Sequence, residues 1–275
     1  MGGKFRSVLI ASDMDGTFLR QDGSVPPRNE RAIRYFTENG GSFTFATGRS
    51  VTQLLQAVPS AAQLCNVPVV TCNGASLYDL KAARELERTL IPFEIATELN
   101  LFLEESGESV GMRLGTDGAF YYNVLNNPYI RQDAEQWGEG ADPIRAVSEW
   151  HRYPIYKIAL RGAAEALGRL RPLLEKRFEG RLSITQSVDT LVDIQGAGCS
   201  KAELLVRFVR EYFDRPMTIC AAGDYDNDLE MLSMADLACC PSNALPCVKA
   251  VCKKEFCSCD EGVIADIIDY LDKIY

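Results

Sequence analysis

The sequence predicts an α/β fold in which a doubly wound, mostly parallel core sheet carries an inserted α+β domain. Two observations support it. At both ends of the chain, short apolar runs alternate with amphipathic stretches, and each run ends in a polar or glycine-containing loop. From about residue 91 to residue 190, the pattern changes to short segments separated by turn signals. We therefore expect a core of residues 1–90 and 191–275 and a second domain of residues 91–190.

The first part of the core contains three strand-like runs. Residues 7–12 form a nearly continuous apolar run, as expected for a strand buried on both faces of a parallel sheet. Residues 26–37 begin with two prolines and predict a helix. Residues 42–46 and 68–72 are the second and third predicted strands, and Ser50 is the expected N-cap of a helix between them.

The inserted segment is predicted to mix helices with hairpins, after which the pattern of the core returns. In the insertion we expect a helix at 94–105, a hairpin at 110–123 with a turn at 116–118, a strand at 155–160, a helix at 163–178 and a strand at 182–185. In the second part of the core we expect a helix at 199–213, a strand at 217–221, a helix from 227 or 228, and a helix at 263–275.

The composition excludes several classes of function. The net charge is −9, and lysine and arginine do not cluster, which argues against a nucleic-acid partner. No apolar run approaches the ~18 residues that a membrane helix needs, and the N-terminus lacks a signal cleavage site, so we expect a cytoplasmic protein without a membrane partner. Ten cysteines lack the spacing of a disulfide framework or a metal site, and we expect reduced, mostly buried thiols.

Acidic and polar side chains follow the predicted strands of the core. Asp13 and Asp15 follow the first strand, Thr47 follows the second, and Asp224 and Asp228 follow the strand at 217–221. The carboxyl ends of parallel strands meet at one edge of a sheet, so these side chains should converge. Carboxylates about 4 Å apart repel by about 4 kcal/mol per pair at an effective dielectric constant of 20. A cation is therefore expected among them, and an all-oxygen site suits Mg²⁺.

These residues resemble the four motifs of the haloacid dehalogenase-like superfamily. The motifs are residues 13–17 (DMDGT), residues 47–49 (TGR), Lys201 and residues 223–228 (GDYDND). Asn73-Gly74-Ala75, Ser200-Lys201 and Asn243-Ala244 resemble the Cof-type branch with an α/β cap, called type IIB. The resemblance spans nearly the whole chain and implies a Rossmann-like core, with residues 91–190 as the cap.

The resemblance also implies roles for the site residues. Asp13 would attack phosphorus and form a phosphoaspartate, and Asp15 would protonate the leaving alcohol and then deprotonate water. The implied catalytic set is Asp13, Asp15, Thr47 and Lys201. The implied substrate-binding set is Thr47, Gly48, Arg49, Asn73, Lys201 and Asn227. The implied Mg²⁺ ligands are Asp13, the Asp15 carbonyl and Asp224, with Asp228 supporting the metal or Lys201.

Three points stay open at the level of residues. Asn73-Gly74 is a good turn dipeptide, so Asn73 could serve the turn alone. Arg113, Tyr121, Tyr122 and Lys157 of the insertion could contact substrate or have ordinary packing roles. Tyr225 and Ala202 depart from the residues usual in the family, and neither change removes a catalytic group.

The predicted function is Mg²⁺-dependent hydrolysis of small phosphoesters, with sugar phosphates as the favoured class. The partner is a small-molecule phosphoester, and we expect a monomer or a weak homodimer. A phosphosugar mutase is an alternative because the same carboxylate pair could return the phosphoryl group to another hydroxyl. A phosphate-ligand sensor with little turnover is the alternative from a different class. No motif identifies the substrate, and we expect the inserted domain to select it.

Overall fold

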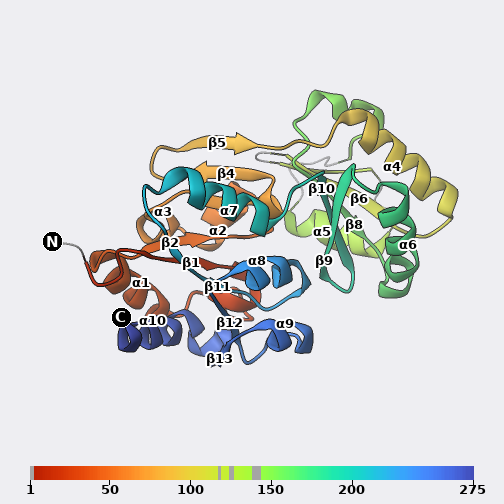
Figure 1. The fold of residues 1–275 in the computed structure, drawn as a ribbon. Helices are drawn as coiled ribbons and strands as arrows, with labels where there is room; N and C mark the ends of the chain where they lie inside the picture. The colour runs from red at the N-terminus through yellow and green to blue at the C-terminus, as the bar shows by residue number, and fades with distance from the viewer. Residues whose placement is uncertain (1–2, 117–118, 124–126, 138–143) are drawn as a thin grey trace. The chain divides into compact units, whose positions relative to one another are not determined.

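The computed structural model describes residues 3–116, 119–123, 127–137 and 144–275, and it divides into two compact units (Figure 1). Unit 1 consists of Met1–Glu87 and Ser200–Tyr275, and unit 2 is Arg88–Cys199. The sequence placed the junctions at residues 90/91 and 190/191. The second junction lies later because strand β10 (Leu191–Gly196), which the sequence analysis did not identify, pairs with β8 and β9 in the sheet of unit 2.

The main sheet of unit 1 has five parallel strands in the order β13-β12-β11-β1-β2. Their bounds are β1 Val8–Ser12, β2 Ser42–Phe45, β11 Thr218–Ala222, β12 Leu237–Pro241 and β13 Lys254–Phe256. β1 lies inside the sheet, between β11 and β2, and all five of its residues are buried. A strand that is apolar on both faces has to be covered on both sides, as an interior strand of this sheet is.

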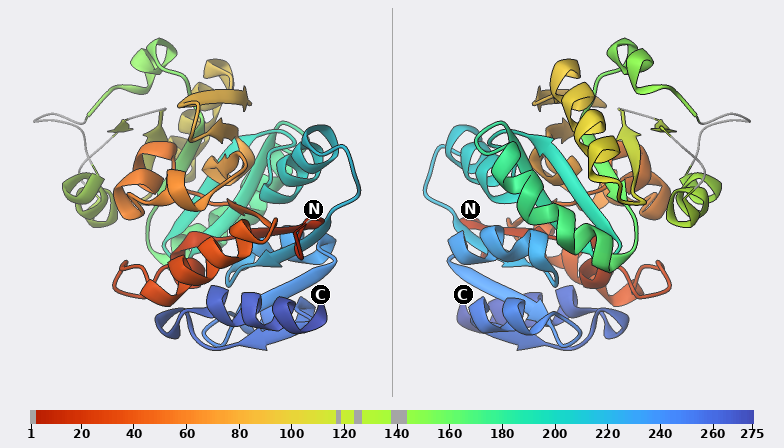
Figure 2. Two further views of the ribbon diagram at one scale, coloured as in Figure 1. Left: turned by 90° about the vertical axis from the view of Figure 1, so that its left-hand side faces the viewer. Right: turned by 90° about the vertical axis from the view of Figure 1, so that its right-hand side faces the viewer.

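Helices cover both faces of this sheet. α1 (Pro27–Glu38) and α10 (Val263–Ile274) pack together on the face where Ile10 points, and α10 is the dark-blue helix in Figure 2. α7 (Lys201–Tyr212) and α8 (Leu229–Met234) pack on the face where Leu9 points. Successive side chains of a strand alternate between faces, so adjacent residues of β1 belong to different hydrophobic clusters. Shorter helices of unit 1 are α2 (Val51–Ala57), α3 (Ala61–Leu64) and α9 (Pro246–Val251).

The third predicted strand exists but belongs to a different sheet. β3 (Val69–Thr71), β4 (Ser76–Asp79) and β5 (Arg84–Arg88) form a three-stranded sheet, and β3 pairs antiparallel with β4. Cys72, Asn73 and Gly74 have φ values of 52°, 54° and 92°, and this left-handed stretch turns the chain back on itself. An isolated parallel bridge between Ala46 and Val70 links β3 to the end of β2.

Unit 2 is built on an antiparallel sheet in the order β7-β6-β8-β10-β9. Its further strands are β6 Gly111–Gly115, β7 Phe120–Tyr122, β8 Lys157–Arg161 and β9 Leu182–Val188, and its helices are α4 Phe93–Ser106, α5 Pro128–Trp137 and α6 Ala164–Arg177. α4 and α6 contribute to the hydrophobic cluster on one face of this sheet. Residues 117–118 of the predicted turn lie outside the described residues.

The predicted fold class is confirmed. The core sheet is parallel and covered by helices on both faces, and the inserted unit is α+β with an antiparallel sheet. Among the residues that the structure describes, no helix is long and apolar enough to cross a membrane.

Candidate active site

The carboxyl ends of β1 and β11 bring the first and last acidic motifs together. Asp13 directly follows β1, and its backbone N–H donates to the carbonyl of Ala222 at the end of β11 (2.8 Å). The two strands are parallel and in register, with Ser12 beside Ala222. The segments that leave them therefore start side by side, one carrying Asp13 and the other Asp224.

Lys201 lies between two carboxylates. It is the first residue of α7, and the side chain of the N-cap residue Ser200 accepts a hydrogen bond from the backbone N–H of Glu203 (3.0 Å). Lys201 Nζ donates to Asp13 Oδ1 at 2.6 Å and to Asp228 Oδ1 at 2.8 Å. The side chain is 1% exposed, so its charge is balanced by these two ion pairs rather than by bulk water.

Asp224 is positioned by the loop that follows β1. Thr17 Oγ1 donates to Asp224 Oδ1 at 2.8 Å. Gly16 has a φ of +75°, and a Cβ atom at this position would lie 2.4 Å from Asp224 Oδ2. Glycine is therefore needed here both for the backbone conformation and for the space that the carboxylate occupies. Asn243 Nδ2 donates to the Gly16 carbonyl (2.8 Å) and holds the same loop.

Asp228 uses both of its carboxylate oxygens within the protein. Oδ1 accepts from Lys201, and Oδ2 accepts from the backbone N–H groups of Asp224 (3.0 Å) and Tyr225 (3.2 Å). At Gly223, a Cβ atom would lie 2.5 Å from Asp228 Cβ, so the glycine permits this close approach. Through these contacts Asp228 orients Lys201 and the loop that carries Asp224.

The cluster has more negative than positive charge. Burial raises the pKa of Asp13 well above its usual range; Lys201 offsets part of this, while Asp228 and Asp224 add to it. Burial, followed by the charge of Asp228, raises the pKa of Asp224 to about 7. Burial alone would lower the pKa of Lys201, but Asp13 and Asp228 outweigh it and raise that pKa. One ammonium group thus faces several carboxylates, and a further cation would relieve their repulsion.

The loop after β2 adds a polar segment. Thr47 is 1% exposed, and its Oγ1 accepts a hydrogen bond from the backbone N–H of Arg49 (3.1 Å). The Thr47 carbonyl accepts from the backbone N–H of Asn73 (2.9 Å), and Asn227 Nδ2 donates to Asn73 Oδ1 (3.3 Å). A Cβ atom on Gly48 would lie 2.9 Å from Asn73 Oδ1. Asn73 therefore joins the loops of two motifs in addition to its place in the turn.

Asp15 is held by Arg49 rather than by the buried cluster. Arg49 Nε donates to Asp15 Oδ2 at 2.8 Å, and Arg49 Nη2 donates to Asp15 Oδ1 at 2.6 Å. The Asp15 side chain is 60% exposed and that of Arg49 is 18% exposed. Both carboxylate oxygens of Asp15 are thus engaged by a two-pronged ion pair on the open side of the loop.

A family model for haloacid dehalogenase-like hydrolases matches residues 10–268, which include every site residue described above. The chain belongs to this family. As a haloacid dehalogenase-like hydrolase, it is an enzyme of the class that the sequence predicted.

Individual relatives agree with this assignment. The HMP-PP phosphatase of Serratia proteamaculans is 28% identical over 259 residues, which cover 88% of this chain and 86% of the relative. A putative HAD/COF-like hydrolase from Plasmodium vivax has a TM-score of 0.83 at 22% identity, with 100% of this chain and 98% of that chain covered. The subclass IIB sugar phosphatase BT4131 has a TM-score of 0.79 at 18% identity, covering 96% and 99%. The two structures show that the fold, with its inserted unit, is the one found in this branch.

The donor set fits a divalent cation. Asp13, Asp224 and Asp228 each offer an oxygen atom within 4.8 Å of the others. Burial and, after it, the charge of Asp228 raise the pKa of Asp224, and oxygen donors of this kind suit Mg²⁺. Asp228 already accepts three hydrogen bonds, so Asp13 and Asp224 are the better-placed carboxylate ligands of the three.

Sequence reasoning missed two positioning residues. Thr17 lies in the first motif, but its hydrogen bond to Asp224 was not anticipated because it joins residues that are far apart in the chain. Asn243 was noted only as part of the resemblance, whereas it bonds both the Gly16 carbonyl and the backbone N–H of Cys259. The position of Asn243 just after β12 was the available signal, but that strand was not predicted.

The candidate residues of unit 2 have structural partners. Arg113 Nη1 donates to Asp133 Oδ2 (2.6 Å), and Lys157 Nζ lies 3.1 Å from Asp193 Oδ1, with all four side chains buried. Tyr122 is buried beside the first pair, and the rings of Tyr121 and Tyr153 lie 4.5 Å apart. These contacts place Arg113, Tyr122 and Lys157 in the interior of unit 2, whereas Tyr121 is partly buried.

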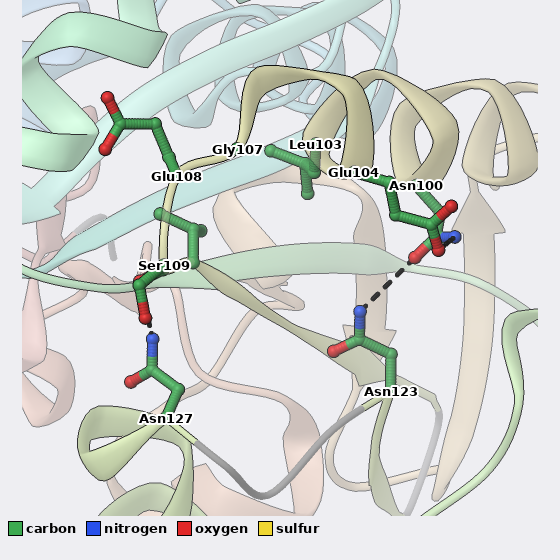
Figure 3. Close-up of a pocket in the computed structure, with 9 residues that line it drawn as sticks. Asn100, Leu103, Glu104, Gly107, Glu108, Ser109, Asn123 and Asn127 are labelled. Carbon is green, nitrogen blue, oxygen red and sulfur yellow. Dashed lines mark hydrogen bonds between the residues drawn. The ribbon is translucent and has the colours of Figure 1, made fainter.

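Unit 2 also contains a polar pocket of about 250 Å³ beside the end of α4 (Figure 3). Its amide side chains bond to one another and to the backbone: Asn123 Nδ2 donates to Asn100 Oδ1 (3.3 Å), and Asn127 Nδ2 donates to the Ser109 carbonyl (2.7 Å). The pocket has none of the site residues predicted from the sequence.

Proposed function

We propose that this chain is a Mg²⁺-dependent phosphatase that hydrolyses small phosphoesters through a phosphoaspartate on Asp13. The observation that carries the proposal is the buried contact of Asp13 with Lys201 inside a cluster of carboxylates at the ends of β1 and β11. Phosphoryl transfer requires alignment and neutralisation of charge, and this cluster offers a fixed nucleophile, a fixed cation and oxygen ligands for a metal.

Each residue has a distinct task in this proposal. A carboxylate oxygen of Asp13 bonds to phosphorus as the bond from phosphorus to the leaving oxygen breaks, and Asp15 gives that oxygen a proton. In the second step, water attacks phosphorus, Asp15 takes a proton from it, and the bond from Asp13 to phosphorus breaks to release phosphate. Thr47 Oγ1 donates to a phosphoryl oxygen, while Lys201 neutralises charge beside Asp13.

The metal would be held by Asp13, Asp224 and the backbone carbonyl of Asp15. It would supply positive charge to the phosphoryl oxygens and to the nucleophile, which otherwise repel one another. Asp228 then acts through Lys201, since its oxygens already accept hydrogen bonds. The substrate-binding roles of Gly48, Arg49, Asn73 and Asn227 belong to the same proposal.

The substrate class we propose is phosphate esters of small molecules. Sugar phosphates are favoured by the sequence resemblance, and the relatives named HMP-PP phosphatases, such as that of Serratia proteamaculans, add HMP-PP to the candidates.

The test is a panel of phosphoesters that includes sugar phosphates, HMP-PP and an aryl phosphate, assayed for free phosphate with Mg²⁺. We expect release of phosphate that stops in excess EDTA and in Asp13→Asn. Turnover by Asp13→Asn at the wild-type rate would contradict the proposed nucleophile. Conversion of a sugar phosphate into an isomer without free phosphate would identify a mutase, and binding without any turnover would identify a sensor.

A further inference from the structure

The ion pair between Arg49 and Asp15 conflicts with the task proposed for Asp15. To donate a proton to the leaving oxygen, the carboxyl group of Asp15 must present one of its oxygens to the substrate. In the structure both oxygens accept hydrogen bonds from the guanidinium group of Arg49, at 2.6 and 2.8 Å. A two-pronged pair of this kind leaves neither oxygen facing a ligand.

Hydrogen bonds hold the backbone of Arg49 in place, whereas its side chain could pair with a phosphoryl group instead of Asp15. The Arg49 N–H donates to Thr47 Oγ1 (3.1 Å), and the Arg49 carbonyl accepts from the N–H of Cys72 (2.9 Å). The backbone of Arg49 therefore lies beside Thr47, the residue proposed to bind a phosphoryl oxygen. Burial lowers the pKa of Arg49, but Asp15 and, after it, Asp13 raise it, so the guanidinium group is within electrostatic reach of the nucleophile.

We propose that Arg49 exchanges partners when substrate binds: it releases Asp15 and pairs with the phosphoryl group. A phosphoryl dianion carries more negative charge than one carboxylate and matches the planar fork of a guanidinium equally well. The exchange frees the Asp15 oxygens for the leaving group only when a phosphoryl group is present. When phosphate leaves, Arg49 returns to Asp15. This inference rests on the proposed function, since it requires a phosphoryl group at this site.

The exchange predicts a change in phosphate affinity that is not expected if Arg49 stays paired with Asp15. In wild type, phosphate must compete with Asp15 for Arg49. In Asp15→Asn the competitor has no charge, so inorganic phosphate should bind about threefold to tenfold more tightly, the range for loss of a partly exposed two-pronged pair. If Arg49 only orients Asp15 and does not reach the phosphoryl group, the substitution gives no gain in phosphate affinity that depends on Arg49.

The experiment is a double-mutant cycle measured by isothermal titration of inorganic phosphate in the presence of Mg²⁺. The four proteins are wild type, Asp15→Asn, Arg49→Gln and the double variant, each checked by thermal melting. Arg49→Met replaces Arg49→Gln if the latter does not fold. We expect the gain seen in Asp15→Asn to disappear when Arg49 is also replaced, and Arg49→Gln alone to bind phosphate more weakly than wild type.

The double variant also controls for charge. Removing the negative charge of Asp15 reduces repulsion of phosphate whether or not Arg49 moves, and that effect would survive in the double variant. A gain of equal size in both backgrounds therefore overturns the exchange, as does the absence of a gain in Asp15→Asn. If wild type hydrolyses phosphoesters but shows no such gain, the inference alone fails. If wild type neither binds phosphate nor hydrolyses phosphoesters, the proposed function fails and the inference with it.

Discussion

Gly16 is required for two reasons, its backbone conformation and the space that Asp224 occupies, and mutation can separate the two. Its φ of +75° strains any side chain, and a Cβ atom would also lie 2.4 Å from Asp224 Oδ2. Gly23 has a similar φ of +80° but nothing within 4 Å of a Cβ atom, so it provides a matched control.

We predict that Gly16→Ala and Gly23→Ala each lose about 1–2 kcal/mol of unfolding free energy from backbone strain. Only Gly16→Ala should displace Asp224, and we expect its Mg²⁺ affinity to fall at least ~10-fold, as for other changes that misorient a metal ligand. Denaturant unfolding measures the first effect, and calorimetric titration of Mg²⁺ measures the second. Equal Mg²⁺ affinities in the two variants would show that Asp224 is not a ligand.

The sequence was informative about individual residues where a motif falls directly after a predicted strand. Asp13, Thr47 and Asp224 were placed this way, and Lys201 was placed at the start of a predicted helix and supported by the family resemblance. The structure brings Asp13, Lys201 and Asp224 into one cluster. The pairing of Arg49 with Asp15 could not be predicted, because the direction of a long side chain depends on packing between loops that are distant in sequence.

At the level of elements, Asn29 connects three segments around the loop that follows β1. It is fully buried in α1; its Nδ2 donates to the carbonyl of Phe18 at the end of the loop segment Met14–Phe18, and its Oδ1 accepts from Ala265 in α10, both at 3.1 Å. Asn66 makes the same kind of bridge, between the carbonyl of Gly41 and the N–H of Phe43, but it is only partly buried.

We predict that Asn29→Ala costs about 2–5 kcal/mol of unfolding free energy, because two buried backbone groups lose their partner. Asn66→Ala should cost about 1 kcal/mol, since water can reach the freed groups. Urea unfolding of both variants at one pH tests this. A cost for Asn66→Ala as large as that for Asn29→Ala would mean that burial does not set the penalty.

The elements that sequence patterns revealed are those with long apolar or amphipathic runs. β1 was found because it is a nearly continuous apolar run, and α10 was found because its apolar residues repeat with the period of a helix. β13 and β5 are short and contain charged residues, such as Lys254 and Glu85, and periodicity carries no signal for such strands. β3 was found as a strand but not assigned to its sheet, because the reversal begins at Cys72, whose φ of 52° is one that cysteine rarely adopts.

For the whole molecule, the acidic cluster links stability to pH and to Mg²⁺. The pKa of Asp224 is raised from an ordinary 3.8 to about 7 in the metal-free protein. The folded state therefore binds this proton more tightly than the unfolded chain does. Its contribution to stability is fully present below pH 3.8 and is lost as pH rises through about 7. Asp13, whose pKa is also raised, acts in the same direction.

We therefore predict that Mg²⁺ raises the melting temperature little at pH 5 and much more at pH 8, because it binds the ionised carboxylates of the folded state. Thermal melts with Mg²⁺ or with EDTA across this pH range provide the measurement. Asp224→Asn should flatten the metal-free profile and remove most of the Mg²⁺ effect. A Mg²⁺ effect that does not change with pH would contradict the assignment of these carboxylates as the ligands.

The pairing of β1 with β11 also has a consequence for how the protein is made. Val8 of β1 pairs with Thr218 of β11, so the two partners leave the ribosome with more than two hundred residues between them. Unit 2 is one continuous stretch that is complete once Cys199 has been added, and a continuous domain can fold during translation. The core sheet cannot form at that stage, because Asp13 has been synthesised but β11 and Asp224 have not. Asp13, the proposed nucleophile, is thus made about two hundred residues before Asp224, and a chain whose synthesis stops before β11 cannot form the site.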